Sequence, residues 1–143
     1  MEYNLARFIN AQRDMYDTAL AEIRGGRKLS HWIWYIFPQL VGLGHSGTAQ
    51  YYGINGMDEA RAYLAEPLLR ARLIEISEAL LALEGTDANA VFGYPDVLKV
   101  RSCMTLFAAV SGGLDNVFGQ VLYKYYGGIA DDRTLEMLGM DRL

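Results

Sequence analysis

The segment from Ser30 to Tyr52, SHWIWYIFPQLVGLGHSGTAQYY, constrains the fold of this chain more than any other segment. It contains both tryptophans and both histidines of the protein, together with a proline and three closely spaced glycines. Large aromatic side chains are usually at least partly buried in folded proteins. Glycines allow backbone conformations that other residues rarely adopt. We therefore expect this segment to enter the core and then leave it through a loop.

The first part of the segment, residues 31–37, is almost wholly apolar or aromatic. Periodicity alone cannot separate a buried strand from a buried helix over so short a run. Ser30 before the run is a favourable helix N-cap, and Pro38 after it is a usual helix stop. Because helical patterns lie on both sides, we predict a short buried helix over this run.

The second part, residues 39–47, predicts a loop, followed by a short helix through Tyr52 that either Ser46 or Thr48 caps. Its GLGHSG sequence lacks the preceding strand and the following Lys-Ser/Thr of a P-loop, and it does not have the form of a nucleophile elbow. A glycine loop that leads into a helix can still present free backbone N–H groups to an anion. The candidate ligand-binding residues in this loop are Gly42, Gly44, His45 and Ser46.

The remainder of the chain shows helical periodicity interrupted by glycine and proline. Further helices are expected over residues 5–24 after an Asn4 cap, 57–65, 68–83, 96–110, 117–126 after an Asn116 cap, and through Leu138 after a cap at Asp131 or Asp132. Asp87 is expected to cap a turn through Phe92. No segment has the alternating pattern of a strand. The sequence therefore predicts an all-α fold, a compact single-domain multihelical orthogonal bundle over residues 1–143 with a short buried central helix.

Composition restricts the classes of function. The 143 residues suit one domain, and the net charge of −4 argues against a general nucleic-acid binder, which needs a basic face. No apolar run approaches the roughly 20 residues of a membrane span, and the N-terminus lacks the form of a signal peptide. Cys103 is the single cysteine, which fits a reducing compartment. We expect a cytoplasmic protein without nucleic-acid or membrane partners.

Candidate functional side chains occur on both sides of the glycine loop. His31 is either held by a neighbouring backbone group or acts as a general acid or base, and it is the one candidate catalytic residue. Trp34 belongs to the core or lines a pocket, and Gln39 binds a ligand amide or sugar or fixes the loop. Lys99 and Ser102 continue one helix face from Asp96, which points to solvent or into a cleft. The ligand-binding candidates outside the glycine loop are therefore Trp34, Gln39, Lys99 and Ser102.

The histidines and the cysteine lack the spacing of metal ligands, so we expect no metal site and no cofactor. Lys124 among Tyr123, Tyr125 and Tyr126 is either a surface lysine or a phosphate contact. Arg101 lies about 200° around the helix from Lys99 and is expected to have a structural role.

Four parts of the chain together resemble an uncharacterised bacterial family, the domain of unknown function 1810 family, whose members are often labelled calpastatin in genomes. They are FINAQRDMYDTALAEIRGG, HWIWYIFPQLVGLGHSGTAQYYGI, YPDVLKVRSCMTLF, and VFGQVLYKYYGG with DDRTLEML. The resemblance implies an all-helical single domain with a short buried central helix, and it brings no established activity. Pro67-Leu68-Leu69 and the Lys99 to Met104 segment also resemble a family proposed to process NAD-derived and ADP-ribose-linked metabolites.

Two hypotheses about function follow. In the first, the protein binds or processes a small phosphorylated or nucleotide-like ligand between the 31–46 segment and the 96–105 helix. In the second, it is a non-catalytic protein-interaction domain whose aromatic segment is purely core. The sequence leaves open whether the protein is an enzyme, and it leaves the oligomeric state open.

Overall fold

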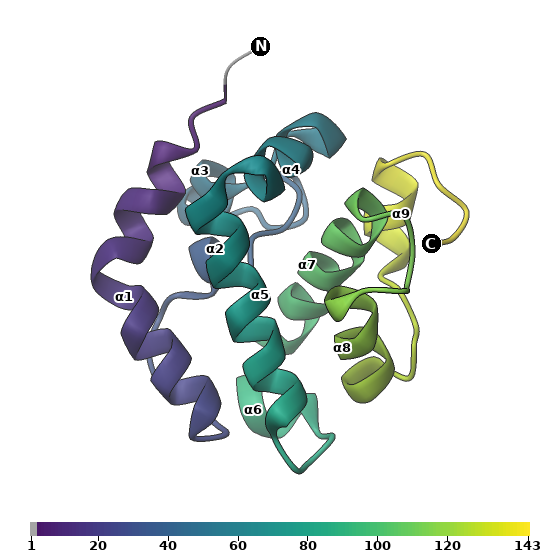
Figure 1. The fold of residues 1–143 in the computed structure, drawn as a ribbon. Helices are drawn as coiled ribbons and strands as arrows, with labels where there is room; N and C mark the ends of the chain where they lie inside the picture. The colour runs from purple at the N-terminus through teal and green to yellow at the C-terminus, as the bar shows by residue number, and fades with distance from the viewer. Residues whose placement is uncertain (1–2) are drawn as a thin grey trace.

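The computed structural model describes residues 3–143. These residues form an all-α bundle, which confirms the predicted fold class (Figure 1). The helices are α1 (Ala6–Arg24), α2 (Ile33–Ile36), α3 (Gly47–Tyr52), α4 (Gly56–Ala65), α5 (Pro67–Ala82), α6 (Ala88–Phe92), α7 (Asp96–Val110), α8 (Val117–Tyr126) and α9 (Asp132–Met137). Among the described residues, extended pairing is limited to one isolated parallel bridge between Leu40 and Ile54. None of the described helices is long and apolar enough to cross a membrane.

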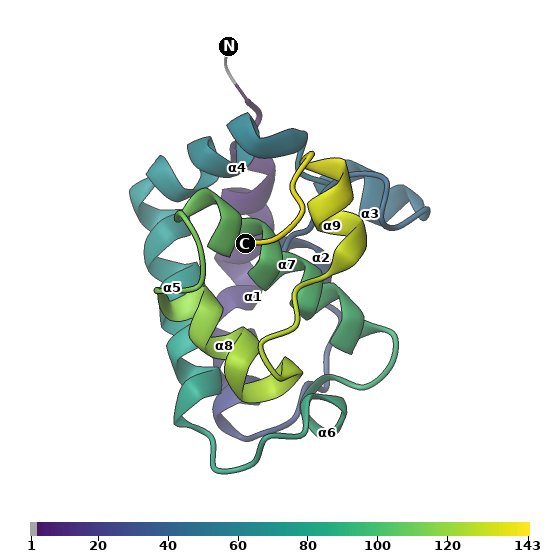
Figure 2. The same ribbon diagram turned by 90° about the vertical axis from the view of Figure 1, so that its right-hand side faces the viewer.

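Helix α5 packs between α1 and α8, and the three elements form one side of the molecule (Figure 1). Behind them, α7 contacts α2, α4, α6, α8 and α9 (Figure 2). Val100 and every residue of the run 102–108 in α7 are buried, so this helix is enclosed nearly all round. The short α2 lies against α1, α3 and α7, and it supplies the buried side chains Ile33 and Ile36. A short buried helix was predicted here, and it is confirmed in a shorter form.

Aromatic side chains join the helices in the core. Phe8 of α1 meets Tyr63 of α4 edge-on, with ring centroids 5.1 Å apart, and Tyr63 lies 5.2 Å from Phe107 of α7. Trp32, just before α2, lies 6.2 Å from Phe37. All five of these side chains are fully buried. Such rings contribute most of the apolar area removed from water and also stabilise one another by their edge and face contacts.

Most predicted helix caps are confirmed. The side chains of Ser46, Asp87, Asn116 and Asp131 each accept a hydrogen bond from the backbone N–H three residues later. Each bond satisfies one of the N–H groups that a helix leaves free at its start.

The predicted caps at Asn4 and Ser30 are wrong. Leu5 holds the N-cap position of α1 without a side-chain bond. Helix α2 begins later than expected, after Trp32, and the Ser30 hydroxyl donates to a carboxylate oxygen of Glu22 at 2.6 Å. The same carboxylate accepts from the backbone N–H groups of Leu29 and Ser30 and from the Trp32 indole, and these charge-assisted bonds hold the chain in place before α2.

The two tryptophans should differ in their effect on stability. Trp32 is fully buried, whereas Trp34 is only partly buried at the edge of the core. We expect Trp32→Ala to lower the free energy of unfolding by about 3–5 kcal/mol and Trp34→Ala by about 1 kcal/mol. Urea denaturation of the two variants measures both values. Equal losses would show that both rings belong to the core.

Candidate functional site

A narrow crevice opens between α2, α3 and α7, and we call it the Trp34–Lys99 crevice. Its lining residues are Ile33, Trp34, Phe37, Gln39, Ala49, Tyr52, Gly53 and Lys99. The crevice has a volume of about 10 Å³, which is room for about one water molecule. Its four side chains with polar atoms, those of Trp34, Gln39, Tyr52 and Lys99, are partly exposed at its mouth.

Lys99, the cation in the crevice, belongs to a cluster of three charged side chains. Asp96, the first residue of α7, binds Lys28 with an N–O distance of 2.9 Å and Lys99 with an N–O distance of 3.5 Å. The Lys99 ammonium also lies 5.4 Å from the centre of the Trp34 ring. Cation and ring attract each other at this distance. Two lysines and one aspartate give the cluster a formal charge of +1, and Lys99 is its more exposed cation.

The uncharged polar groups at the mouth have no hydrogen-bond partner among the described residues. Within residues 3–143, the Trp34 indole N–H, the Gln39 side-chain amide and the Tyr52 hydroxyl make none of the hydrogen bonds that the structure contains. Two groups elsewhere do form such bonds: the Trp32 indole donates to Glu22, and the Tyr126 hydroxyl donates to the Val97 carbonyl. The crevice is therefore lined by polar side chains that have no hydrogen-bond partner among the described residues.

Tyr52 is a hydrogen-bond donor at this site. Burial raises the pKa of its hydroxyl, Tyr51 acts in the same direction, and Arg7 opposes them. The hydroxyl therefore keeps its proton at neutral pH.

Two glycines, one in the loop before α3 and one directly after α3, allow this loop to pack closely against the helix. A Cβ atom on Gly53 would lie 2.6 Å from the Cα of Val41, and a Cβ on Gly44 would lie 2.7 Å from the Cβ of Ala49. Real Cβ atoms do not approach other atoms so closely, so both positions require glycine for packing. Gly42 has a φ of +100°, which favours glycine for a different reason.

The wall that carries Tyr52 and Gly53 is held by Arg7 of α1. The Arg7 guanidinium donates to the carbonyl oxygens of Tyr51 and Gly53, each at 2.9 Å. Two further bonds, at 2.9 and 3.1 Å, join it to the buried carboxylate of Glu59. The crevice wall is thereby tied to both α1 and α4.

The opposite wall depends on Glu22. Its carboxylate accepts hydrogen bonds from the backbone N–H groups of Leu29 and Ser30, from the Ser30 hydroxyl and from the Trp32 indole. Burial raises the pKa of this carboxyl, but the hydrogen bonds from Ser30, Leu29 and Trp32 outweigh that effect and lower the pKa to about 2. These bonds fix the segment that leads into α2 and therefore the position of Trp34.

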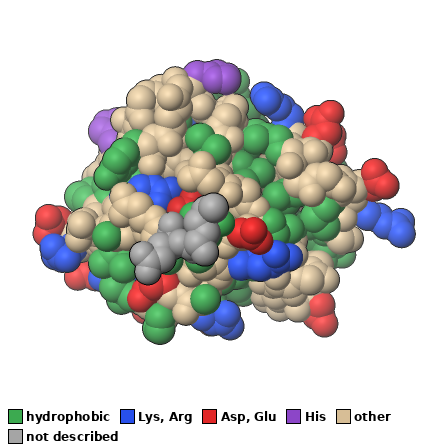
Figure 3. All heavy atoms as spheres, turned by 90° about the horizontal axis from the view of Figure 1, so that it is seen from above, with side chains coloured by type: hydrophobic (Ala, Val, Ile, Leu, Met, Phe, Trp, Pro, Cys, Tyr) green, Lys and Arg blue, Asp and Glu red, His purple; other side chains and the backbone are tan. Residues whose placement is uncertain are grey.

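The structure brings together three of the candidate residues, Trp34, Gln39 and Lys99, with Gly44 packed beside the Gln39 amide. The other candidates lie elsewhere. Both His31 and His45 are exposed and do not line the crevice, and Figure 3 shows histidine side chains on the outside of the molecule.

The remaining candidates have local contacts of other kinds. Ser46 caps α3, and Gly42 packs near Met137 of α9. Ser102 is buried, and its hydroxyl donates to the Leu98 carbonyl one turn earlier. Leu98 is exposed on the same helix, which turns its other faces into the core. Within the described residues, no group of three histidine, cysteine or acidic side chains could hold a metal ion.

Sequence reasoning missed Tyr52 and Lys28. Tyr52 adjoins the more exposed Tyr51, and nothing in the pattern separates the two rings. Lys28 lies 68 positions before Asp96, so no spacing links them. The detectable signal was Asp96 itself, a carboxylate in the first turn of α7 beside Lys99.

The Glu22 contacts predict a pH effect. A carboxyl with a lowered pKa in the folded state stabilises the fold above its unfolded pKa of about 4.5, and this contribution is lost as the pH falls towards 2. Glu22→Gln removes the charge and keeps an acceptor for Trp32. We expect the variant to be less stable than the wild type at about pH 7 and the difference to shrink at about pH 3. Urea denaturation at both pH values measures this, and an unchanged difference would contradict it.

Comparisons with known proteins agree with this fold. The chain is similar to the conserved hypothetical protein Rv1873 from Mycobacterium tuberculosis, known from a crystal structure. The two share 43% identity with a TM-score of 0.93, over 96% of this chain and 98% of that chain. A search of curated proteins finds no match. The family described as "Protein of unknown function (DUF1810)" matches residues 2–138. The chain therefore belongs to the DUF1810 family of proteins of unknown function.

Proposed function

We propose that this protein binds a small anionic ligand at the Trp34–Lys99 crevice and holds it by a carboxylate or phosphate group. The observation that carries the proposal is the convergence of unused polar groups at one opening. Lys99 offers a cation, and Trp34, Gln39 and Tyr52 offer hydrogen-bond donors that no described residue occupies. Charge-assisted hydrogen bonds to such anions are about twice as strong as neutral ones.

The electrostatics of the site favour a negative ligand. Asp96 neutralises only one of the two lysines beside it, so the cluster keeps a formal charge of +1. Lys28 is almost fully buried and is occupied by Asp96, whereas Lys99 is more exposed and makes the longer contact. An ammonium has three donors, so Lys99 retains donors for a ligand oxygen.

The size of the crevice limits what enters it. About 10 Å³ accommodates one oxygen of a carboxylate or phosphate group and no larger part of a ligand. The rest of the ligand would therefore lie outside, along the exposed surface around Trp34. A nucleotide-like ligand fits this arrangement when its phosphate enters first, and a small carboxylic acid fits it equally. The lining combines donors with one cation, which supports binding as the function of the site.

Thermal unfolding tests the proposal. Inorganic phosphate, acetate, AMP and ADP-ribose are titrated into the wild type, with sodium chloride at equal ionic strength as the reference. At 100 times its dissociation constant, a ligand stabilises the fold by about 2.7 kcal/mol, which raises the melting temperature by about 5–10 °C. We expect at least one of these anions to produce this shift, and the effective compound distinguishes phosphate from carboxylate recognition.

Matched variants locate the site. Lys99→Met keeps an apolar stem over Trp34 and removes the charge, so it should abolish the shift. Gln39→Leu removes the amide and should weaken binding by about tenfold. Arg61→Met, on an exposed residue of α4, should respond like the wild type. If no anion shifts the wild type, or if Lys99→Met shifts equally, the anion site is contradicted and the interaction-domain hypothesis is favoured.

A further inference from the structure

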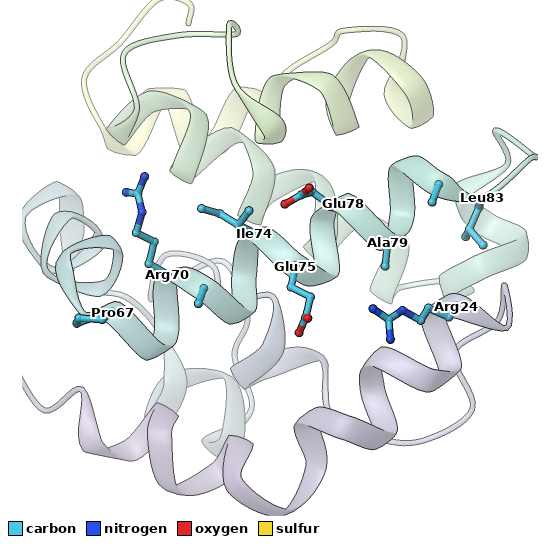
Figure 4. A pocket seen from close by; sticks show the side chains of 10 residues that line it. Arg24, Pro67, Arg70, Ile74, Glu75, Glu78, Ala79 and Leu83 are labelled. Carbon is cyan, nitrogen blue, oxygen red and sulfur yellow. The ribbon is translucent and has the colours of Figure 1, made fainter.

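A second and larger hollow, with a volume of about 730 Å³, extends along the outer side of α5 (Figure 4). Arg70, Ile74 and Glu78 line it at four-residue intervals, which places them in one row along the helix. In Figure 4 the three side chains project from the same side of α5. None of the residues that line this hollow also lines the Trp34–Lys99 crevice.

The two charges at the ends of the row have no partner among the described residues. Arg70 and Glu78 are both exposed, and neither makes an ion pair or a side-chain hydrogen bond with another residue in 3–143. Glu75, on the neighbouring face, differs because its carboxylate accepts a 2.5 Å hydrogen bond from the Tyr16 hydroxyl. Arg70 and Glu78 are therefore available to a group outside the chain.

The charges along the row are complementary to those of a second, antiparallel copy of the same row. Arg70 and Glu78 lie four residues before and after Ile74, so each is about 6 Å along the helix axis from the centre of the row. A two-fold rotation about an axis through Ile74 reverses the helix and exchanges the two ends. Arg70 of one copy then faces Glu78 of the other, and the second pair forms at the same time. Ile74 meets its own counterpart at the centre.

Small side chains on this face allow two α5 helices to approach each other. Ala71 and Ala82 are exposed and line the same hollow, so little bulk stands between this face of α5 and an approaching helix. Packed helices lie about 8–10 Å apart, depending on the side chains at the contact, and shallow crossings near 20° keep positions four residues from the crossing point within reach. We propose that this row docks a second copy of the chain, with the two α5 helices antiparallel and related by a two-fold axis through Ile74.

Analytical ultracentrifugation tests the proposal on the full chain. The wild type should show a reversible rise in mass from 16.0 kDa towards twice that value as concentration increases to about 1 mM. Arg70→Glu alone places two carboxylates against each other at both ends, and Glu78→Arg alone does the same with two cations. Each single variant should weaken dimer formation by about tenfold or more. The double variant R70E/E78R restores both pairs and should dimerise like the wild type.

A mixture of the two single variants gives the most specific result. In a heterodimer of R70E with E78R, one end pairs Glu with Arg and the other pairs the native Glu78 with the native Arg70, so both contacts are complementary. We therefore expect the equimolar mixture to dimerise about tenfold or more tightly than either variant alone. Arg61→Glu, on an exposed residue of α4, serves as the charge-matched control and should leave dimerisation unchanged. Circular dichroism should show that all variants keep the wild-type helix content.

Three results would overturn the proposal. One is a wild type that remains at 16.0 kDa throughout the concentration range. Another is a wild-type dimer that both single reversals leave intact. The third is a mixture of the two single variants that stays monomeric. None of these outcomes bears on the anion site, because the two hollows share no residue.

Discussion

The ion pair between Arg7 and Glu59 is the interaction on which the arrangement of the site depends. All five N–H donors of the Arg7 guanidinium are engaged, three with the carbonyl oxygens of Asn4, Tyr51 and Gly53 and two with Glu59. Burial raises the pKa of Glu59, but the bonds from Arg7 and Asn55 outweigh it and lower the pKa, so the carboxylate stays charged. A buried pair of this kind is costly to break, because the remaining charge has no solvent.

Two other cationic side chains also donate hydrogen bonds to backbone carbonyl oxygens. Arg101 donates to the carbonyl oxygens of Ile129 and Ala130, which confirms its structural role. Lys124 donates to the carbonyl oxygens of Leu80, Leu81 and Leu83 at the end of α5, so its three donors are used within the chain and not for phosphate. Arg101 and Lys124 thus provide hydrogen-bond donors for carbonyl groups that have no partner within a helix. The polar groups of the Trp34–Lys99 crevice differ from these side chains, because they have no hydrogen-bond partner among the described residues, and this supports the proposed binding role.

Local signals in the sequence were sufficient for most of the fold. Helical periodicity, glycine stops and side-chain caps such as Asn116 act over a few residues, so they predicted α5, α7 and α8 closely. The failure at Ser30 involves a partner eight positions away. The Glu22 carboxylate binds Leu29, Ser30 and Trp32 before α2, and no short-range pattern reveals these contacts. For the site, aromatic and cationic residue types indicated Trp34 and Lys99, whereas the position of His31 outside the crevice depends on packing alone.

Native-state hydrogen exchange of Arg7→Lys tests most directly whether the Arg7 cluster holds the crevice wall. Lysine keeps a positive charge beside Glu59 but cannot reach all five acceptors. In the wild type, the Val41 and Ile54 amides donate to Ile54 and Gln39 across the wall. We predict that these two amides exchange at least about tenfold faster in the variant, while buried amides of α5 such as those of Leu73 and Ile76 change little. An equal change at all four amides, or none, would contradict the account.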